Sequence, residues 1–380
     1  MTRRDLICSR SMTPLSRRQL GLGALGAGAF AAAGGLGLRP AAAATDVYWI
    51  GWQGYDECFH ATDYIETNDI AFNTTYINSN EEVITKLQAG GIGQYDVSTM
   101  YFGYVQLMAA ASLIDPIDES KVDVLVDGTL IGQFLEKDAL RYDGKLYGVP
   151  WTWGTLPCMY DPAATTPPAR WKDLWNDEYK GKVVMIHDPL GNLMVWIPAI
   201  TGNYSPDKTT HAQLTETIDA LIDLKKNHAR AMAQSYGEAA DMFARDEVTV
   251  SALGWEAMVG FAAEKGKVID FQIPEEGTLM FMDCLIIPKD APHPDMAYDL
   301  ANICLSVPGQ ELLAANLGQA ITNTAAVPLV SEANREMYRY DDMAVISEKA
   351  YLYPMPPLES DGTHATYDEM LEEYERLLKA

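Results

Sequence analysis

The sequence predicts an α/β protein of two lobes with largely parallel sheets. Short apolar runs of strand-forming residues alternate with longer amphipathic segments along most of the chain. Such repeated strand–helix units form parallel sheets in known folds. At 380 residues the chain is also longer than one hydrophobic core usually supports, which indicates two domains.

Strands and helices are predicted from residue 47 onward. VYWIGW (47–52) has the residues of a strand, and SNEEVITKLQAG (79–90) begins a helix with Ser79 and Glu82 at capping-box spacing. Further strand-type runs are YDVSTM (95–100), KVVMI (182–186), VTVSALGW (248–255) and TLMFMDCLIIP (278–288). The other helical segments are YFGYVQLMAAA (101–111), LTETIDALIDLKKNH (214–228), EAMVGFAAEKG (256–266), MAYDLANICLSVPGQELLAANLG (296–318), which Pro308 splits into two helices, and TYDEMLEEYERLLKA (366–380).

Residues 1–44 have the pattern of an export signal. An arginine pair at 17–18 precedes a weakly apolar Gly/Ala-rich run, and the alanines at 42–44 suit a signal peptidase. Twin arginines before a mild apolar core resemble the twin-arginine (Tat) signal. The run is too rich in glycine for a transmembrane helix, and Cys8 precedes it, which excludes a lipoprotein signal. We therefore expect a soluble, periplasmic mature chain that starts at Thr45 and is not inserted in the membrane.

The chain is strongly acidic, with 53 Asp and Glu against 28 Lys and Arg and a net charge of −25. This charge argues against nucleic acid and anionic membrane surfaces as partners. It would draw cations towards the protein, although an ordinary solvated acidic surface accounts for the same composition. The charge therefore permits a cationic ligand and does not by itself indicate one.

Cysteines and histidines indicate no metal or cofactor site. Four cysteines follow the signal, and neither they nor the six histidines have metal-ligand spacing. In an oxidising compartment the cysteines can form disulfides, and burial as small free hydrophobic residues is an equally good interpretation. These cysteines are Cys58, Cys158, Cys284 and Cys304.

Ligands of open α/β sheets bind outside the carboxyl ends of the strands, so the residues that end the predicted strands are site candidates. These positions are rich in Trp, Tyr and Asp and contain no Lys or Arg. They are residues 52–55, 98–101, 187–188, 254–255 and the segment around Asp283.

Asp283 is the most informative of these residues, because its neighbours in LMFMDCLIIP (279–288) are apolar. An unpaired buried carboxylate costs several kcal/mol, so Asp283 needs a cation, a salt bridge or access to water. The tryptophans and tyrosines can be ordinary core residues, and Asp188 can be a helix N-cap. Together, however, ring faces and carboxylates suit an organic ammonium ion, through cation–π attraction of about 0.5–2 kcal/mol per ring and charge-assisted hydrogen bonds.

With these residues in view, the chain resembles the periplasmic spermidine/putrescine-binding proteins, the solute receptors of polyamine ABC importers. The resemblance covers residues 46–380. It rests on the order and spacing of GWQGY, SNEEVITKLQAG, QYDVSTMY, YGVPWTWGTLPCMYDP, RWKDLWNDEYKGKVVMIHD, EVTVSALGW, GTLMFMDCLIIPKDA and EEYERLLKA.

The resemblance implies a periplasmic-binding-protein fold, in which two α/β lobes hold the ligand between them. By analogy the chain crosses between lobes near residues 150–153, 280–283 and 322–327. The first lobe would comprise residues 45–152 and 283–327, and the second residues 153–282 and 328–380.

The resemblance also implies roles for particular residues. Trp52 and Tyr55 match aromatic ligand contacts, Trp255 matches an indole that packs along the methylene chain, and Asp188 and Asp283 match ammonium-binding carboxylates. Phe281 stands where the family often has Trp, and Tyr101 completes the aromatic set. Two departures are Gly191, where spermidine binders often have another acid, and Gly103, near a frequent Tyr. Asp361, which aligns with a polar contact, is included in the expected site, and Glu256 or Glu238 could also compensate.

We therefore expect a monomeric receptor that captures putrescine or spermidine and delivers it to the membrane permease of an ABC importer. An enzyme is the first alternative, because acid pairs also serve glycoside hydrolysis, but no catalytic motif stands in a supporting context. Receptors for a sugar, a quaternary ammonium ion or a GABA-like amino acid are the second. A receptor for a GABA-like amino acid needs a cationic side chain to bind the ligand carboxylate, and the predicted strand ends contain no Lys or Arg.

Overall fold

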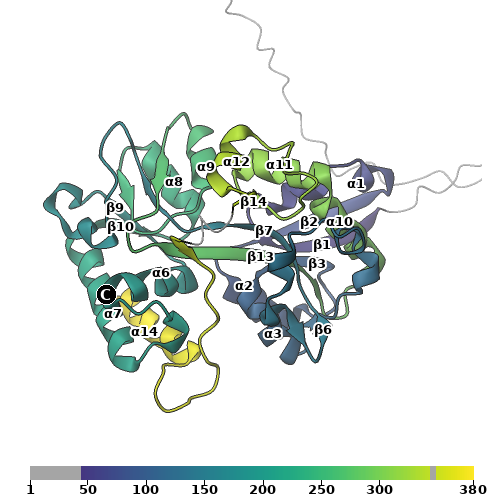
Figure 1. Ribbon diagram of the computed structural model, residues 1–380, viewed down its shortest axis with the longest axis horizontal. Coiled ribbons are helices and arrows are strands. Elements are labelled where there is room, and N and C mark those ends of the chain that lie inside the picture. Colours follow the sequence, from purple (N-terminus) through teal and green to yellow (C-terminus); the bar gives the residue numbers. More distant parts are fainter. Residues whose placement is uncertain (1–43, 343–347) are drawn as a thin grey trace, which may run out of the picture. The chain divides into compact units, whose positions relative to one another are not determined.

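The computed structural model describes residues 44–342 and 348–380, shown in Figure 1. Residues 44–380 form one compact unit. The predicted export signal lies outside the described residues, apart from Ala44. Within the described ranges, no helix has the length and apolar character needed to cross a membrane.

The first sheet has eight strands, and six of them follow the order β14-β7-β13-β3-β1-β2. β1 is parallel to β2 and β3, whereas β13 is antiparallel to β3 and β7. Two short strands, β4 and β15, pair with β13. The strands are β1 (Thr45–Trp52), β2 (Ile70–Ile77), β3 (Val97–Tyr101), β4 (Ile114–Asp115), β7 (Val149–Thr155), β13 (Thr278–Pro288), β14 (Ala320–Ile321) and β15 (Ala350–Tyr351). Helices α2 (Asn80–Lys86), α3 (Phe102–Ala110), α10 (Pro294–Leu305) and α11 (Val307–Leu317) pack against this sheet.

The second sheet has five strands in the order β10-β9-β11-β8-β12. They are β8 (Cys158–Tyr160), β9 (Val183–Ile186), β10 (Ala229–Ala233), β11 (Val250–Ser251) and β12 (Asp270–Gln272). The helices on this side are α6 (Pro189–Thr201), α7 (His211–Asn227), α8 (Tyr236–Ala244), α9 (Met258–Ala263) and the C-terminal α14 (Tyr367–Lys379). α14 packs against α7 and α6.

Strands β7 and β13 connect the two sheets. They run side by side with Asp283 opposite Thr152, and β7 is followed after two residues by β8 of the second sheet. In Figure 1, β13 extends from the side of α6 and α14 to the strands beside α2 and α3. All eleven residues of β13 are buried, which explains why its sequence is apolar.

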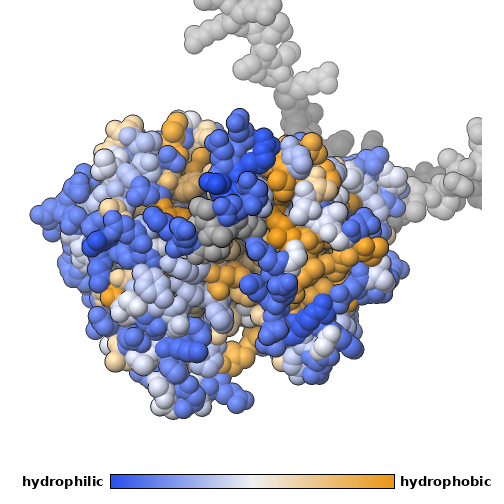
Figure 2. All heavy atoms as spheres, in the orientation of Figure 1, coloured by the Kyte–Doolittle hydropathy of each residue, from blue (hydrophilic) through white to orange (hydrophobic). Residues whose placement is uncertain are grey.

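The remaining elements are short. They are α1 (Tyr64–Thr67), α4 (Asp123–Val126), α5 (Gly132–Leu135), α12 (Glu332–Tyr338), a hairpin of β5 (Arg141–Tyr142) and β6 (Lys145–Leu146), a π-helical turn η2 (Leu87–Gly91) and six 3-10 helices of three to six residues, η1 (Tyr55–His60), η3 (Glu119–Lys121), η4 (Asp138–Leu140), η5 (Trp171–Trp175), η6 (Asp177–Tyr179) and η7 (Pro206–Lys208). Hydrophilic side chains dominate the outer parts of the face in Figure 2, and hydrophobic ones concentrate towards its middle.

The predicted two-lobed α/β fold is confirmed, and the strand at 278–288 matches β13 at both ends. Three local predictions are wrong in detail. Ser79 is the N-cap of α2, but its side chain makes no capping bond, so the capping box is absent. The strand expected at 248–255 is only β11, because the chain leaves the sheet after Ser251. Finally, Pro308 does not separate the two predicted helices, because α10 and α11 meet at Ser306 and Pro308 stands in the first turn of α11. A proline is tolerated there because the N–H groups of the first turn have no partner within the helix.

All four cysteines of the described residues are free and buried. Burial raises the pKa of the thiols well above the usual range. They therefore serve as small hydrophobic side chains in this structure, which is one of the two roles their spacing allowed.

Candidate ligand-binding site

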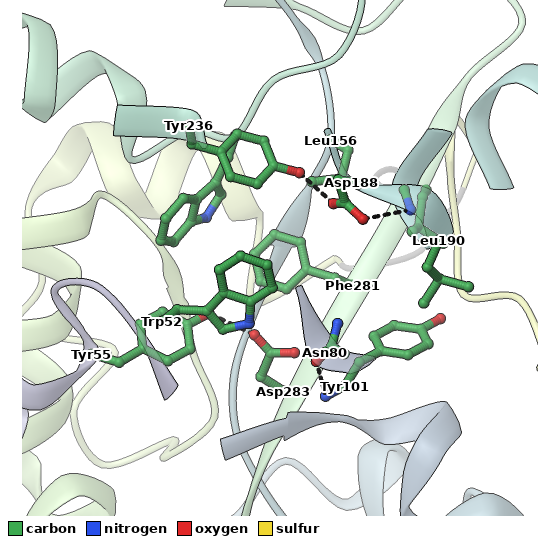
Figure 3. Close-up of a pocket in the computed structure, with 13 residues that line it drawn as sticks. Trp52, Tyr55, Asn80, Tyr101, Leu156, Asp188, Leu190, Tyr236, Phe281 and Asp283 are labelled. Atoms are coloured by element: carbon green, nitrogen blue, oxygen red, sulfur yellow. Dashed lines mark hydrogen bonds between the residues drawn. The ribbon is translucent and has the colours of Figure 1, made fainter. Parts of the chain in front are cut away.

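A pocket with about 440 Å³ of empty space, part of it open to solvent, lies among residues that come from both sheets and from the strands between them. Its lining residues are Trp52, Tyr55, Asn80, Tyr101, Leu156, Asp188, Leu190, Gly191, Tyr236, Trp255, Leu279, Phe281 and Asp283 (Figure 3). In the view of Figure 3, Asp188 and Asp283 stand on opposite sides, with Phe281 and the Trp52 indole between them. The lining thus combines two carboxylates, aromatic rings and leucines.

The turn after β1 places the first two rings. Gly54 has a φ of 89°, a conformation that glycine adopts without strain, and this bend starts the 3-10 helix η1 at Tyr55. A side chain at Gly54 would also collide with Leu317. As a result, Trp52 ends the strand at the pocket, and the Tyr55 ring turns inwards and is buried.

Asp283 accepts a hydrogen bond from Tyr55. The hydroxyl oxygen of Tyr55 lies 2.6 Å from Oδ2, and Gln319 donates to the same hydroxyl at 3.2 Å. The pairing of β13 with β7 shifts register between Asp283 and Cys284, an irregularity of the kind that re-aims a side chain. Within the described part of the chain, neither lysine nor arginine forms an ion pair with Asp283. Burial, together with the negative charge of Asp188, raises the pKa of Asp283 to about 7, although the Tyr55 hydrogen bond opposes the rise.

Asp188 is both a helix cap and a pocket residue. It is the N-cap of α6, where Oδ1 accepts the N–H of Gly191 at 2.9 Å. Oδ2 accepts the hydroxyl of Tyr236 at 2.5 Å. Burial raises the pKa of Asp188 to about 6, and these two hydrogen bonds limit the rise. The ordinary N-cap role that the sequence allowed is therefore present, and it fixes the carboxylate at the pocket.

Four rings form a continuous wall. Tyr236 packs edge-to-face against Trp52, with ring centroids 6.2 Å apart, and against Trp255, at 5.6 Å. Trp255 packs in the same way against Tyr55, at 5.9 Å. Trp255 thus stands between two tyrosines, and each tyrosine donates its hydroxyl to one of the two carboxylates. The wall holds both acids in place while leaving ring surface for an apolar chain.

Gly191 and Gly103, the two positions where this chain departs from the family pattern, have no room for a larger side chain in this structure. An ideal Cβ on Gly191 would lie 2.6 Å from Oδ2 of Asp188 and 2.8 Å from Leu156, so the chain cannot carry an acid there in this conformation. A Cβ on Gly103 would lie 2.6 Å from Cγ of Met355. Met355 therefore fills the space next to Tyr101 that a larger residue at 103 would need.

Seven of the eight expected site residues line this pocket, and Asp361 is the exception. Its carboxylate accepts the N–H groups of Thr363 and His364 at 2.8 Å each and pairs with the His364 ring at 2.6 Å. These backbone bonds, more than the ring, hold the pKa of Asp361 below its usual range. The residue stabilises an exposed turn.

The other two acids considered as compensating groups also lie apart from the lining. Glu238 accepts the N–H of Gln234 at the start of α8. Glu256 is buried, and its Oε1 accepts the N–H of Thr155 at 2.7 Å and the hydroxyl at 2.5 Å. Its other oxygen has no partner among the described residues, and burial raises the pKa of Glu256 to about 7.

Two polar lining residues, Asn80 and Tyr236, were not predicted. Each comes three residues after a strand, β2 and β10 respectively, that the sequence pattern did not reveal. Asn80 accepts the N–H of Tyr101 at 3.2 Å and so ties α2 to the end of β3. The rule that ligands bind beyond strand ends would have found both residues, had β2 and β10 been predicted.

The lining contains no lysine, arginine or histidine, and no group of metal-binding side chains occurs in the part of the chain that the structure describes. Two buried carboxylates therefore face one pocket without a built-in positive charge. Such an arrangement can neutralise a ligand that brings its own cationic groups, and it disfavours an anionic ligand.

Comparison with known proteins places this chain in a family. The chain is 27% identical over 327 residues to the spermidine/putrescine-binding periplasmic protein of Escherichia coli, a match that covers 83% of this chain and 90% of the relative. The resemblance inferred from the sequence is thereby confirmed. Among solved structures, the spermidine/putrescine ABC transporter substrate-binding protein PotD of Streptococcus pneumoniae has a TM-score of 0.67 and 22% identity, covering 88% of this chain and 98% of that one.

The fold also serves other ligands. The Atu4243-GABA receptor has a TM-score of 0.59 and 14% identity, and the match covers 88% of this chain and 95% of that one. The sequence profile of bacterial extracellular solute-binding proteins matches residues 60–338, which is more than half of the sequence. The chain therefore belongs to the family of bacterial extracellular solute-binding proteins, which are transport receptors.

Proposed function

We propose that this protein is the periplasmic receptor of an ABC importer and that it captures a polyamine, putrescine or spermidine, in the described pocket. One observation carries the proposal: Asp188 and Asp283 face the same aromatic pocket, and the lining offers neither of them a cation. Each acid is hydrogen-bonded to a neutral tyrosine hydroxyl instead. A ligand with two ammonium groups joined by methylenes complements both features.

Each group has a distinct task in this proposal. Asp283 binds one ammonium group through Oδ1, which accepts no hydrogen bond from the described residues, while Tyr55 keeps Oδ2 oriented. Asp188 binds the other ammonium group. Trp52, Tyr55 and Trp255 hold the methylene chain between their rings and attract the adjacent charges, and Phe281 and Tyr101 complete the apolar wall.

The lining also favours an amine over the other ligands of this fold. A GABA-like amino acid brings a carboxylate that would need an arginine or a lysine, and the thirteen lining residues include neither. A sugar leaves two buried carboxylates without a counter-charge, which is costly. A quaternary ammonium ion fits the rings but has no N–H group to donate to the acids.

Because β7 and β13 join the two sheets, we propose that the two sides close around the ligand by bending at these strands before the ligand is delivered. We assign residues 45–152 with 283–327 to one lobe and 153–282 with 328–380 to the other, moving as hinged bodies. The closed, ligand-bound form would be recognised by the membrane permease. We further propose Tat-dependent export to the periplasm, a monomeric state, and binding without chemical change to the ligand.

Isothermal titration calorimetry tests the proposal. The mature protein, from Thr45, is titrated with putrescine, cadaverine, spermidine, choline, GABA and glucose. We expect saturable heat with the diamines or spermidine, and the affinity for these ligands should fall as the salt concentration increases. GABA and glucose should give no saturable heat. Saturable binding of GABA or glucose without binding of any polyamine would contradict the proposal.

A further inference from the structure

A second polar cluster lies outside the pocket, where helices of the two sheets meet. Glu81 is in the first turn of α2, and Tyr104 is in α3; both helices pack against the first sheet. Tyr367 is the first residue of α14, which packs against α7 and α6 on the side of the second sheet. The cluster therefore joins parts of the chain that belong to different sheets.

Both tyrosine hydroxyls converge on one carboxylate oxygen. The hydroxyl of Tyr104 lies 2.6 Å from Oε1 of Glu81, and the hydroxyl of Tyr367 donates to the same oxygen. The two hydroxyls also lie within hydrogen-bonding distance of each other. Tyr104 is 0% exposed and Tyr367 is 5% exposed. Glu81 itself is half-buried, and hydrogen bonds to a carboxylate are stronger than neutral ones, so the cluster links the two sides.

The cluster is connected to the pocket from both sides. Asn80, which precedes Glu81, lines the pocket. On the other side Tyr374, two turns along α14, accepts a hydrogen bond from Asn192 at 3.1 Å. Asn192 belongs to the first turn of α6, whose N-cap is Asp188. Of the helices that meet at the cluster, α2 carries a pocket residue, and α14 is bonded to α6, which carries Leu190 and Gly191 of the lining.

We propose that Glu81, Tyr104 and Tyr367 form a latch that holds the pocket closed, with Glu81 as a positioning residue for ligand retention. The bond between Glu81 and Tyr367 exists only when α2 and α14 are adjacent, so its free energy favours the closed form alone. None of the three residues lines the pocket. Loss of the latch therefore leaves the ligand contacts intact and speeds ligand release.

The proposal rests on the proposed function for its ligand, and rapid-mixing kinetics with putrescine test it. The variants are Tyr367→Phe, which removes only the hydroxyl, and Glu81→Gln, which removes the charge. We expect the release rate to rise about ten-fold in either variant, with the association rate within two-fold of the unsubstituted protein, as loss of a charge-assisted bond predicts. Tyr64→Phe is the matched control, because it removes a hydroxyl bonded at 2.5 Å to Asp299 within the first-sheet side.

Small-angle scattering without ligand gives a second readout, which does not depend on the ligand. Tyr367→Phe and Glu81→Gln should increase the radius of gyration, and Tyr64→Phe should not. Unchanged release rates and unchanged scattering in both latch variants would overturn the latch, as would equal effects of the control. If the unsubstituted protein does not bind putrescine but the scattering changes as expected, the ligand assignment fails and the latch stands.

Discussion

The hydroxyl of Tyr236 lies 2.5 Å from Oδ2 of Asp188, and on the other side of Trp255 the hydroxyl of Tyr55 makes the corresponding bond to Asp283. Each acid of the pocket is therefore oriented by a neutral donor. A lysine or arginine in the same place would orient the carboxylate equally well, but it would also cancel the charge that a cationic ligand needs. The tyrosines supply orientation without neutralisation.

Replacing Asp283 with asparagine should weaken putrescine binding strongly. Truncating one partner of a buried charge pair typically costs about 2–5 kcal/mol, so we expect the dissociation constant to rise by at least ten-fold in calorimetry. The ligand-free variant should be at least as stable as the unsubstituted protein, because the buried carboxylate has no cationic partner among the described residues. Unchanged affinity would remove Asp283 from the site.

Affinity for putrescine should increase as the pH rises from about 5 to about 8. Burial raises the pKa of Asp283 to about 7 and that of Asp188 to about 6, so both are largely protonated at the lower end in the empty pocket. The ligand binds the ionised forms, and binding must therefore release protons. Calorimetry in buffers of different ionisation enthalpy measures that release, and no release at pH 6 to 7 would contradict this account.

The stability of the ligand-free protein should show the opposite trend. The folded-state pKa of Asp283 is raised above its ordinary value of 3.8, so the folded protein binds more protons than the unfolded chain. The contribution of Asp283 to stability is thus fully present below about pH 4 and is lost as the pH rises through about 7. Comparing the unfolding midpoints of the unsubstituted protein and Asp283→Asn at pH 5 and pH 8 isolates this effect, since surface carboxylates are common to both.

Removing the Tyr236 hydroxyl should alter the pH profile of binding. The Tyr236 hydrogen bond lowers the pKa of Asp188 against the effect of burial. In Tyr236→Phe the ring contacts with Trp52 and Trp255 can remain, while the pKa of Asp188 rises. We expect the affinity at pH 6 to fall more than the affinity at pH 8. A uniform loss at both pH values would indicate a role in packing alone.

Gly191→Ala should disturb the site through a single methyl group. The added Cβ would lie 2.6 Å from the Asp188 carboxylate and 2.8 Å from Leu156, and overpacking of this kind costs about 1–3 kcal/mol. We expect a lower unfolding midpoint and weaker putrescine binding. Gly132→Ala is the control, because its Cβ would meet no atom within 4 Å, and it should leave putrescine binding unchanged and should not lower the unfolding midpoint.

The sequence was most informative where chemistry and local pattern conflict. Asp283 stands out in an apolar strand, and the pocket lies at that residue. Asp361 was included through alignment with a polar contact, and the structure instead places it in an exposed turn, where its carboxylate accepts the N–H groups of Thr363 and His364. Tyr236 lies beyond a strand, β10, in which only Ala233 is fully buried, so its sequence lacks the alternation that marks a strand. The tyrosine that hydrogen-bonds to each acid is determined by packing between residues far apart in the sequence. No local sequence pattern encodes such a pairing.

The position of Asp283 bears on attempts to retune this receptor as a biosensor. Asp283 belongs to β13, which pairs with β7 where the chain passes from one sheet to the other. Under the proposed binding role and hinge motion, a mutation there would change recognition and mechanics at once, and a reporter signal would mix the two. Asp188 and Tyr236 stand at the starts of α6 and α8, on the side of the second sheet, so selectivity can be redesigned there without changing β7 or β13.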